Sequence, residues 1–559
     1  MSKLRRILVP ALGWLALACS PTQQGTEIDS QTNWMKACQI DAQCGGGELR
    51  CICGVCTSAC GGDDACSTLE GGACVAADEP GAIARCGGVK PSDPGLCLPR
   101  CEDVPCPVGQ MCVASVCEPI REPKARVTVN TQNRHQTLIG FGASIAYAEA
   151  DLTNHPLRDD LFGVAFAGLG LDVVRLRNRY QDAVDDDLSI SRDLLDAVAT
   201  SLGREPTILL SSWSPPAALK ANASAECQGN VGTCTLIKTP AGAYDYAGFA
   251  RYWRESLEAY AAVGIVPSFI GIQNNSNWVP TAQEPGKACR FLPVEGTTTV
   301  TIAGVPVEVA YPGYAEALSA TLEALQGLAA MPKVLAPETS DFAAVADYTP
   351  EIDLASVDAL AHHLYGVDPQ ALDMDGLAAL RDFSNTYARP ILQTEMQANS
   401  YDTAVLIHHT LEVEGASAYV LTTLTNATGA PGGNTTAPIG LGPEGYVIQD
   451  TYYALQHYAL HTDPGWTRVS SDPSEPELLS TAWLSPAEDE LTVVLVNTGA
   501  SELDVGLDFG PEPAPTYARA DVTRTVFDRA EKYVSLGSLT PEGILTLPPR
   551  SMVTVAYSN

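Results

Sequence analysis

Five short segments of polar and aromatic residues each follow an apolar run in the middle of the chain. The indole rings of Trp213 and Trp278 offer flat faces for a sugar ring, and Asn, His and Tyr side chains can bind its hydroxyl groups. No segment has the spacing of a metal site or of a phosphate-binding glycine loop. We therefore expect carbohydrate binding, with no metal and no cofactor. The segments are 211–216 (SSWSPP), 273–278 (QNNSNW), 337–338 (PE), 362–365 (HHLY) and 393–396 (QTEM).

The apolar runs alternate with helical patterns between residues 138 and 455. Residues 246–263, for example, carry large apolar side chains at helical spacing. Seven or eight strand–helix units in roughly 300 residues predict an α/β fold, a (β/α)8 TIM barrel, in which the loops after the strands meet at one end. The five polar segments would then surround one site. The apolar runs are 173–176, 208–210, 269–272, 334–335, 359–361, 391–392 and 418–421.

The chain on either side of the predicted barrel has a different texture. Residues 118–124 are polar and contain two prolines, which is typical of a linker, and the alternation that follows predicts a strand at 125–137. Residues 456–559 contain short β-rich runs separated by Gly, Pro and Ser, which predict an antiparallel β-sandwich.

The N-terminal residues are typical of an export signal. Three basic residues precede the apolar run 7–18, which is shorter than the ~20 residues that a membrane span needs. The residues before Cys19 resemble a bacterial lipoprotein cleavage box, so we expect residues 1–18 to be removed and Cys19 to be lipidated. Residues 19–37 would be a linker. The protein would be exported and lipid-anchored at the bacterial cell envelope, or otherwise secreted.

Cysteines are concentrated in residues 38–118, which hold 14 of the 18 in the chain. This segment has few large apolar residues, so we predict a small disulfide-rich module with bridges worth ~2–4 kcal/mol each. A zinc module is the alternative, because Cys51, Cys53 and Cys56 are closely spaced, but the segment has no histidines. Cys227 and Cys234 form a plausible local bridge, which would leave Cys289 unpaired. The connectivity and the role of the module stay open.

The charge balance excludes two classes of partner. The chain has 66 Asp and Glu residues against 33 Lys and Arg, a net charge of −33. Such a surface repels nucleic acid and anionic lipid. We therefore expect membrane contact only through a lipid on Cys19, and a carbohydrate as the partner of the barrel.

Four motifs in chain order resemble glycoside hydrolase family 30, from about residue 127 to the C-terminus. The resemblance implies a (β/α)8 barrel fused to a β-sandwich side domain that includes the strand 125–137. It also implies retaining hydrolysis of β-glycosidic bonds by two carboxylates about 5–5.5 Å apart. The motifs are 136–144 (QTLIGFGAS), 209–216 (LLSSWSPP, followed by LK at 219–220), 464–469 (PGWTRV) and 547–551 (LPPRS).

The resemblance assigns roles to individual residues. Glu395 in the run LQTEM matches the family nucleophile. Arg175, His363 and Tyr365 match positions that hold the nucleophile and the sugar, and Asn274 matches the residue that binds the 2-hydroxyl group.

The acid/base position departs from the family pattern. Relatives have Gln-Asn-Glu-Pro where this chain has Gln-Asn-Asn-Ser at 273–276, so Asn275 replaces the catalytic Glu. An amide cannot donate the proton that the leaving oxygen needs, and general acid–base help contributes about 10²–10⁴ in rate.

Three interpretations follow from Asn275. Another acid substitutes, either Glu284 in the same loop or Glu338; or the barrel binds carbohydrate without turnover, as an adhesin or glycan sensor; or the barrel is purely structural. We favour the first because Glu395, Arg175 and Trp213 are all retained.

The natural glycan stays open. The segments 287–291 and 336–339 look most like the xylanase branch, but residues 426–445 contain no Lys or Arg to bind a glucuronate branch. We therefore disfavour glucuronate-dependent xylanase action.

Overall fold

The computed structural model describes most of the chain from residue 33 to residue 559. The predicted signal peptide, Cys19 and Glu284 lie outside the described residues. The residues left out are 1–32, 37, 46, 70–71, 80–81, 83–85, 87–94, 100–109, 114–115, 120–122, 183–185, 228, 230, 282–285, 303, 370, 428–435, 511–515 and 540–542.

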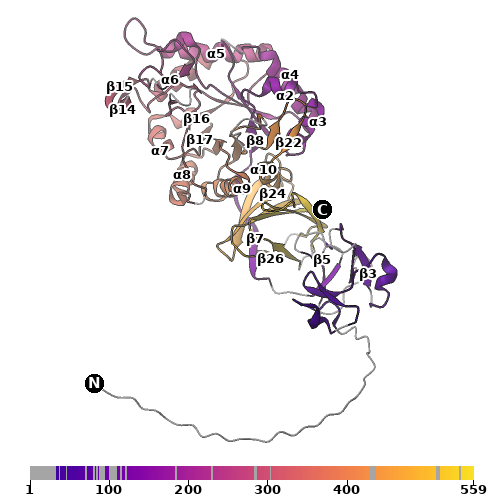
Figure 1. The fold of residues 1–559 in the computed structure, drawn as a ribbon. Helices are drawn as coiled ribbons and strands as arrows, with labels where there is room; N and C mark the ends of the chain where they lie inside the picture. The colour runs from indigo at the N-terminus through magenta and orange to yellow at the C-terminus, as the bar shows by residue number, and fades with distance from the viewer. Residues whose placement is uncertain are drawn as a thin grey trace, which may run out of the picture.

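Eight parallel strands close into a barrel that occupies the middle of the chain (Figure 1). Each strand pairs with the next, and the last, β19, closes on β8. The strands are nearly all buried, which explains why they appear in the sequence as continuous apolar runs. The predicted TIM barrel is confirmed. Its strands are β8 (Gly140–Ser144), β9 (Val173–Arg177), β10 (Thr207–Ser211), β12 (Phe269–Gly271), β16 (Lys333–Thr339), β17 (Ala359–His363), β18 (Ile391–Glu395) and β19 (Ala418–Leu421).

The helices between these strands cover the barrel. The longest, α5 (Tyr246–Ala262), begins where the Asp245 side chain accepts a hydrogen bond from Gly248 N at 2.8 Å. It buries Phe249, Trp253 and Tyr260 completely. None of the described helices is long and apolar enough to cross a membrane. The other helices are α2 (Glu149–Thr153), α3 (Arg158–Phe162), α4 (Leu188–Leu202), α6 (Tyr314–Leu325), α7 (Val345–Tyr348), α8 (Met374–Tyr387), α9 (Ser400–His409) and α10 (Asp450–Ala459).

The C-terminal part forms the predicted β-sandwich side domain, with its own apolar core. The strand before the barrel, β7 (Ala125–Thr137), lies between β23 and β26. The side domain is therefore built from the chain segments that precede and follow the barrel in sequence. The β7–β26 pair is parallel, whereas the other neighbours in the sheet are antiparallel. The remaining strands are β23 (Thr467–Pro473), β24 (Leu478–Leu484), β25 (Glu490–Asn497), β26 (Leu503–Phe509), β27 (Arg519–Val526), β28 (Val534–Ser538), β29 (Ile544–Leu547) and β30 (Ser551–Ser558).

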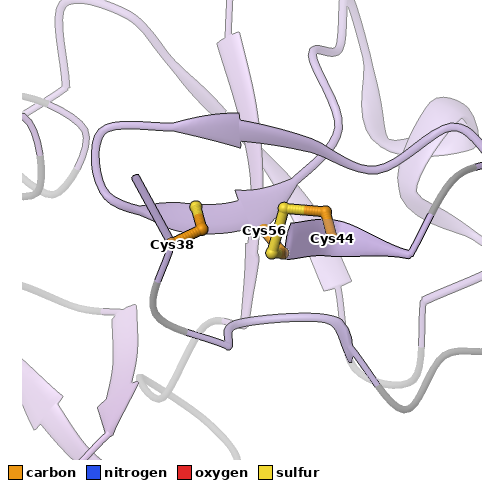
Figure 2. A group of neighbouring side chains, drawn as sticks. All are labelled: Cys38, Cys44 and Cys56. Carbon is orange, nitrogen blue, oxygen red and sulfur yellow. A yellow bond between two sulfur atoms is a disulfide. The ribbon is translucent and has the colours of Figure 1, made fainter. Parts of the chain in front are cut away.

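Disulfides hold the N-terminal module, as predicted from its cysteine content. The sulfur atoms of Cys38, Cys44 and Cys56 lie within metal-binding distance of one another, but Cys44 is bonded to Cys56 (Figure 2) and Cys38 to Cys51. These bonds favour the disulfide interpretation over zinc, because a bridged sulfur is not a thiolate ligand. The further bridges described are Cys53–Cys86, Cys60–Cys74, Cys66–Cys97 and, in the barrel, Cys227–Cys234, while Cys289 is buried and unpaired.

Buried histidines link the barrel to the side domain. His457 of α10 bonds Thr554 Oγ1 at 2.8 Å through Nδ1 and Thr525 Oγ1 at 2.9 Å through Nε2. His408 of α9 bonds Thr481 Oγ1 at 2.9 Å. Burial lowers the pKa of His457 to about 3 and the pKa of His408 well below its usual value. Both imidazoles are therefore neutral while the interface is intact.

We expect this interface to be sensitive to acid. The pKa of His457 is lower in the folded chain than in the unfolded chain, so its contribution is complete above about pH 6.5 and is lost as the pH falls toward about 3. The full effect on the free energy of unfolding is on the order of 5 kcal/mol. Denaturant unfolding at pH 7 and pH 4 should show a smaller loss of stability on acidification for His457→Gln than for the wild type. Parallel losses would contradict this role for His457.

Candidate active site

The barrel brings the predicted residues to one end because its strands are parallel. Arg175 lies on β9 and Glu338 on β16, while His363 and Glu395 are the last residues of β17 and β18. Asn274 and Asn275 follow β12 within four residues of its end. Neighbouring side chains alternate along a strand, so of the two histidines on β17 only His363 contacts this group. His362 instead bonds Glu414 behind the barrel wall.

Arg175 is the centre of this group. Its Nη1 donates to Glu395 Oε2 at 2.5 Å, and its Nη2 donates to Asn274 Oδ1 at 2.6 Å and to Glu338 Oε1 at 2.9 Å. The guanidinium lies 4.5 Å from the centre of the Trp213 ring and is completely buried. Burial alone would lower the pKa of Arg175, but Glu395 and Glu338 together raise it. The arginine is therefore a permanent cation that fixes two carboxylates and one amide.

Glu395 is held at the edge of the site. Its Oε2 accepts from Arg175 and its Oε1 accepts from the Tyr365 hydroxyl, and the residue retains 5% exposure. Burial and the neighbouring Glu395 carboxylate raise the pKa of Tyr365, so the hydroxyl stays protonated and donates a hydrogen bond to Glu395. A carboxylate fixed between two donors is positioned to attack, or to stabilise, a cationic anomeric carbon.

Glu338 has a different environment. It is completely buried beneath Arg175, and its Oε1 also accepts from Ser211 Oγ at 2.7 Å. A Cβ at position 271 would lie 1.9 Å from Glu338 Oε2, so Gly271 provides the space for this carboxyl group. Burial raises the pKa of Glu338. A carboxyl group enclosed in this way has no path to a leaving group in solvent, so its place is that of a hydrogen-bonding partner of Arg175.

Asn275 occupies the expected acid/base position, in a left-handed backbone conformation with φ of 50° that asparagine adopts readily. The Nδ1 of His363 donates to Asn275 Oδ1 at 2.8 Å and lies 4.0 Å from Glu395 Oε2. Burial, followed by the charge of Arg175, lowers the pKa of His363 well below its usual value. The amide and the neutral imidazole can both form hydrogen bonds, but neither is a strong proton donor.

Aromatic side chains surround the opening. Trp278 and Tyr365 are 37% and 38% exposed. The sequence prediction missed Tyr147, which is 53% exposed and has a φ of 67°. Its ring stands 6.5 Å from that of Trp213 and 4.4 Å from the Arg177 guanidinium. The sequence could have indicated it, because Tyr147 comes three residues after the first barrel strand, β8, just as Trp213 comes two residues after β10.

A pocket of about 580 Å³ extends from Tyr147 along the loops that follow β8 and β19. Its lining is mixed, with the polar residues Asp151, His155, Thr423 and Asn426 beside small apolar ones. Tyr147 belongs both to this pocket and to the aromatic group around Trp213, so the pocket adjoins the candidate site at the barrel mouth.

Comparisons with known proteins bear on the fold. No family model and no curated protein matches the sequence. The structure is similar to a glycoside hydrolase family 30 subfamily 8 xylanase from Clostridium acetobutylicum, with TM-score 0.58 and 17% identity over 78% of this chain and 100% of that chain. It is also similar to a conserved exported protein from Bacteroides fragilis, with TM-score 0.61 and 15% identity over 77% and 99%. An endo-β1,6-glucanase has TM-score 0.54 and 13% identity over 80% and 96%. These similarities show the fold alone: the chain shares with these proteins a closed (β/α)8 barrel joined to a β-sandwich side domain.

We expect Arg175 to be essential for folding as well as for the site. Arg175→Met leaves the buried Glu338 without a cation, which should cost roughly 3–5 kcal/mol of unfolding free energy in denaturant titrations. Arg519→Met is the matched control, because Arg519 pairs with Asp521 on the exposed surface of β27 and should lose less than about 1 kcal/mol. Equal losses would contradict the central role of Arg175.

Proposed function

We propose that the protein is a retaining β-glycosidase that acts on a polysaccharide or glycoconjugate, with Glu395 as the nucleophile. The observation that carries this proposal is the fixed, slightly exposed carboxylate of Glu395 between Arg175 and Tyr365. The family 30 fold and the aromatic rim at Trp213 support it. Glu395 would attack the anomeric carbon of the sugar, and water would later release the glycosyl group. Asn274 and His363 would position the sugar and the nucleophile.

The proton donor is the missing part of this mechanism. Among the described residues, the only other carboxyl group that bonds Arg175 is Glu338, which is enclosed. Glu284 is therefore the candidate for a substitute acid. In the sequence it lies three residues before Lys287, whose Nζ is 5.7 Å from the centre of the Tyr147 ring at the barrel mouth. The loop that carries Glu284 therefore returns to the barrel mouth at Lys287. With no acid at position 275, we expect slow turnover of ordinary linkages and faster reaction of sugars with good leaving groups.

A second function is favoured by Asn275 itself. A barrel mouth that retains aromatic rings, Asn274 and His363 but carries an amide in place of the acid is suited to binding a glycan without cleaving it. In an exported protein anchored through a lipid on Cys19, as we also propose, such a site would serve as an adhesin or a glycan sensor.

Activated substrates separate these two functions. The glycosidase proposal predicts slow hydrolysis of an aryl β-glycoside with a good leaving group, and its loss in Glu395→Gln. An activated 2-fluoro sugar should attach covalently to Glu395, and mass spectrometry of the peptide would locate it. Binding of oligosaccharides without any labelling or hydrolysis would favour the second function.

Restoring the acid gives the sharper test. We expect Asn275→Glu to raise the rate on poorly activated β-glycosides by about 10² or more, because it supplies the missing proton donor. The backbone tolerates glutamate in a left-handed conformation elsewhere, since Glu338 has a φ of 55°. Asn275→Gln is the matched control and should give no gain.

If Asn275→Glu brings no gain and Glu284→Gln abolishes the wild-type activity, the acid lies at Glu284. If neither variant changes the rate, the two-carboxylate mechanism is wrong for this protein.

A further inference from the structure

A second pocket lies at the opposite end of the barrel. It encloses about 670 Å³, within the ~300–1,000 Å³ of typical ligand sites. Ile139, Pro390 and Ser417 line it, and they immediately precede β8, β18 and β19. Glu395 is at the other end of β18. This basal pocket is therefore separate from the candidate active site, and β7, β23, α8 and the loops before β18 and β19 contribute its remaining walls.

The basal pocket is basic in a strongly acidic protein. Arg134, His135, Arg381, Arg389 and Arg468 line it, and no Asp or Glu is among the described residues that do so. Since acidic residues outnumber Lys and Arg by 66 to 33 in the chain, this is a marked local reversal of charge. Such a reversal favours an anionic ligand.

Most of these arginines have acidic partners outside the pocket lining. Arg468 bonds Glu412 at 2.6 Å, Arg134 bonds Glu488 at 2.5 Å, and Arg381 bonds the exposed Asp382 at 3.2 Å.

Arg389 is the exception. Its Nε and Nη1 donate to the backbone carbonyls of Leu354 and Ala388, at 2.9 Å and 3.3 Å, and it has no acidic partner among the described residues. Nη2 of Arg389 and Nη2 of Arg468 also make no hydrogen bond to any described residue. The pocket thus has an uncompensated positive charge and unused guanidinium donors, the groups that bind a carboxylate best.

The neutral lining matches the rest of a sugar. The side chains of Thr137, Asn385 and Ser417 line the basal pocket and make no hydrogen bond to the described residues, so they are available to hydroxyl groups. Ile139 and Pro390 add a small apolar surface that suits the C–H face of a pyranose ring.

We propose that the basal pocket binds a carboxylate-bearing sugar, that is, a uronate. Its carboxylate bonds Arg389 and Arg468, and its hydroxyl groups bond Thr137, Asn385 and Ser417. The proposal is independent of hydrolysis at Glu395. It also places uronate recognition away from the barrel mouth, where residues 426–445 supply no Lys or Arg.

The test is calorimetric titration of the full chain with D-glucuronate, D-glucose, acetate and inorganic phosphate. D-glucuronate should bind at least about tenfold more tightly than each of the others, and more weakly as salt is added. Arg389→Gln should weaken glucuronate binding about tenfold or more, because it removes the charge-assisted donor. The surface variant Arg519→Gln and the active-site variant Glu395→Gln should leave it unchanged.

A second variant guards against misfolding of Arg389→Gln. Asn385 is exposed, so Asn385→Asp places a negative charge in the pocket without disturbing its walls and should also weaken glucuronate binding. The proposal is overturned if glucuronate binds no better than acetate or phosphate, if glucose binds equally well, or if neither pocket variant changes the affinity. Loss of binding in Glu395→Gln alone would place the uronate at the barrel mouth and would also overturn it.

Discussion

The buried guanidinium of Arg175 is the interaction on which the rest of the site depends. An arginine side chain cannot lose its proton in a protein, so complete burial requires acceptors around it. Here they come from β16, from β18 and from the loop after β12, and they are in reach only when the barrel is closed. Closure of the barrel and assembly of the site are therefore one event, and a change at Arg175 affects both.

One cation holds two carboxylates in unequal environments. Glu338 is enclosed beside Gly271 and Ser211, where burial raises its pKa, whereas Glu395 keeps some exposure and a second donor, Tyr365. The difference separates a structural carboxylate from a chemically accessible one. Beside the amide of Asn275, His363 is neutral, so among the described residues that contact Arg175 the accessible negative charge is that of Glu395.

The outer parts of the protein use different means of stabilisation. The N-terminal module has little apolar core and depends on disulfides, whereas the side domain has its own core and joins the barrel through buried, neutral histidines such as His457. The surface is strongly acidic, which makes the arginines of the basal pocket conspicuous. A uronate bound there would lie a full strand length from Glu395, so binding and catalysis would involve separate surfaces.

The sequence by itself determined the barrel, the side domain and the strand ends that carry Glu395, Asn275 and His363. Strands buried on both faces appear as apolar runs, and parallel pairing leaves their ends together. It also indicated disulfides and the local Cys227–Cys234 bridge, but not which cysteines of the N-terminal module pair. Only the tertiary structure decided that Glu338 is enclosed, that the Tyr147 ring stands beside Trp213 and Arg177, and that arginines far apart in sequence share a pocket. These features depend on burial and on contacts between segments that are distant in sequence. A local pattern of residue types predicts neither the burial nor those contacts.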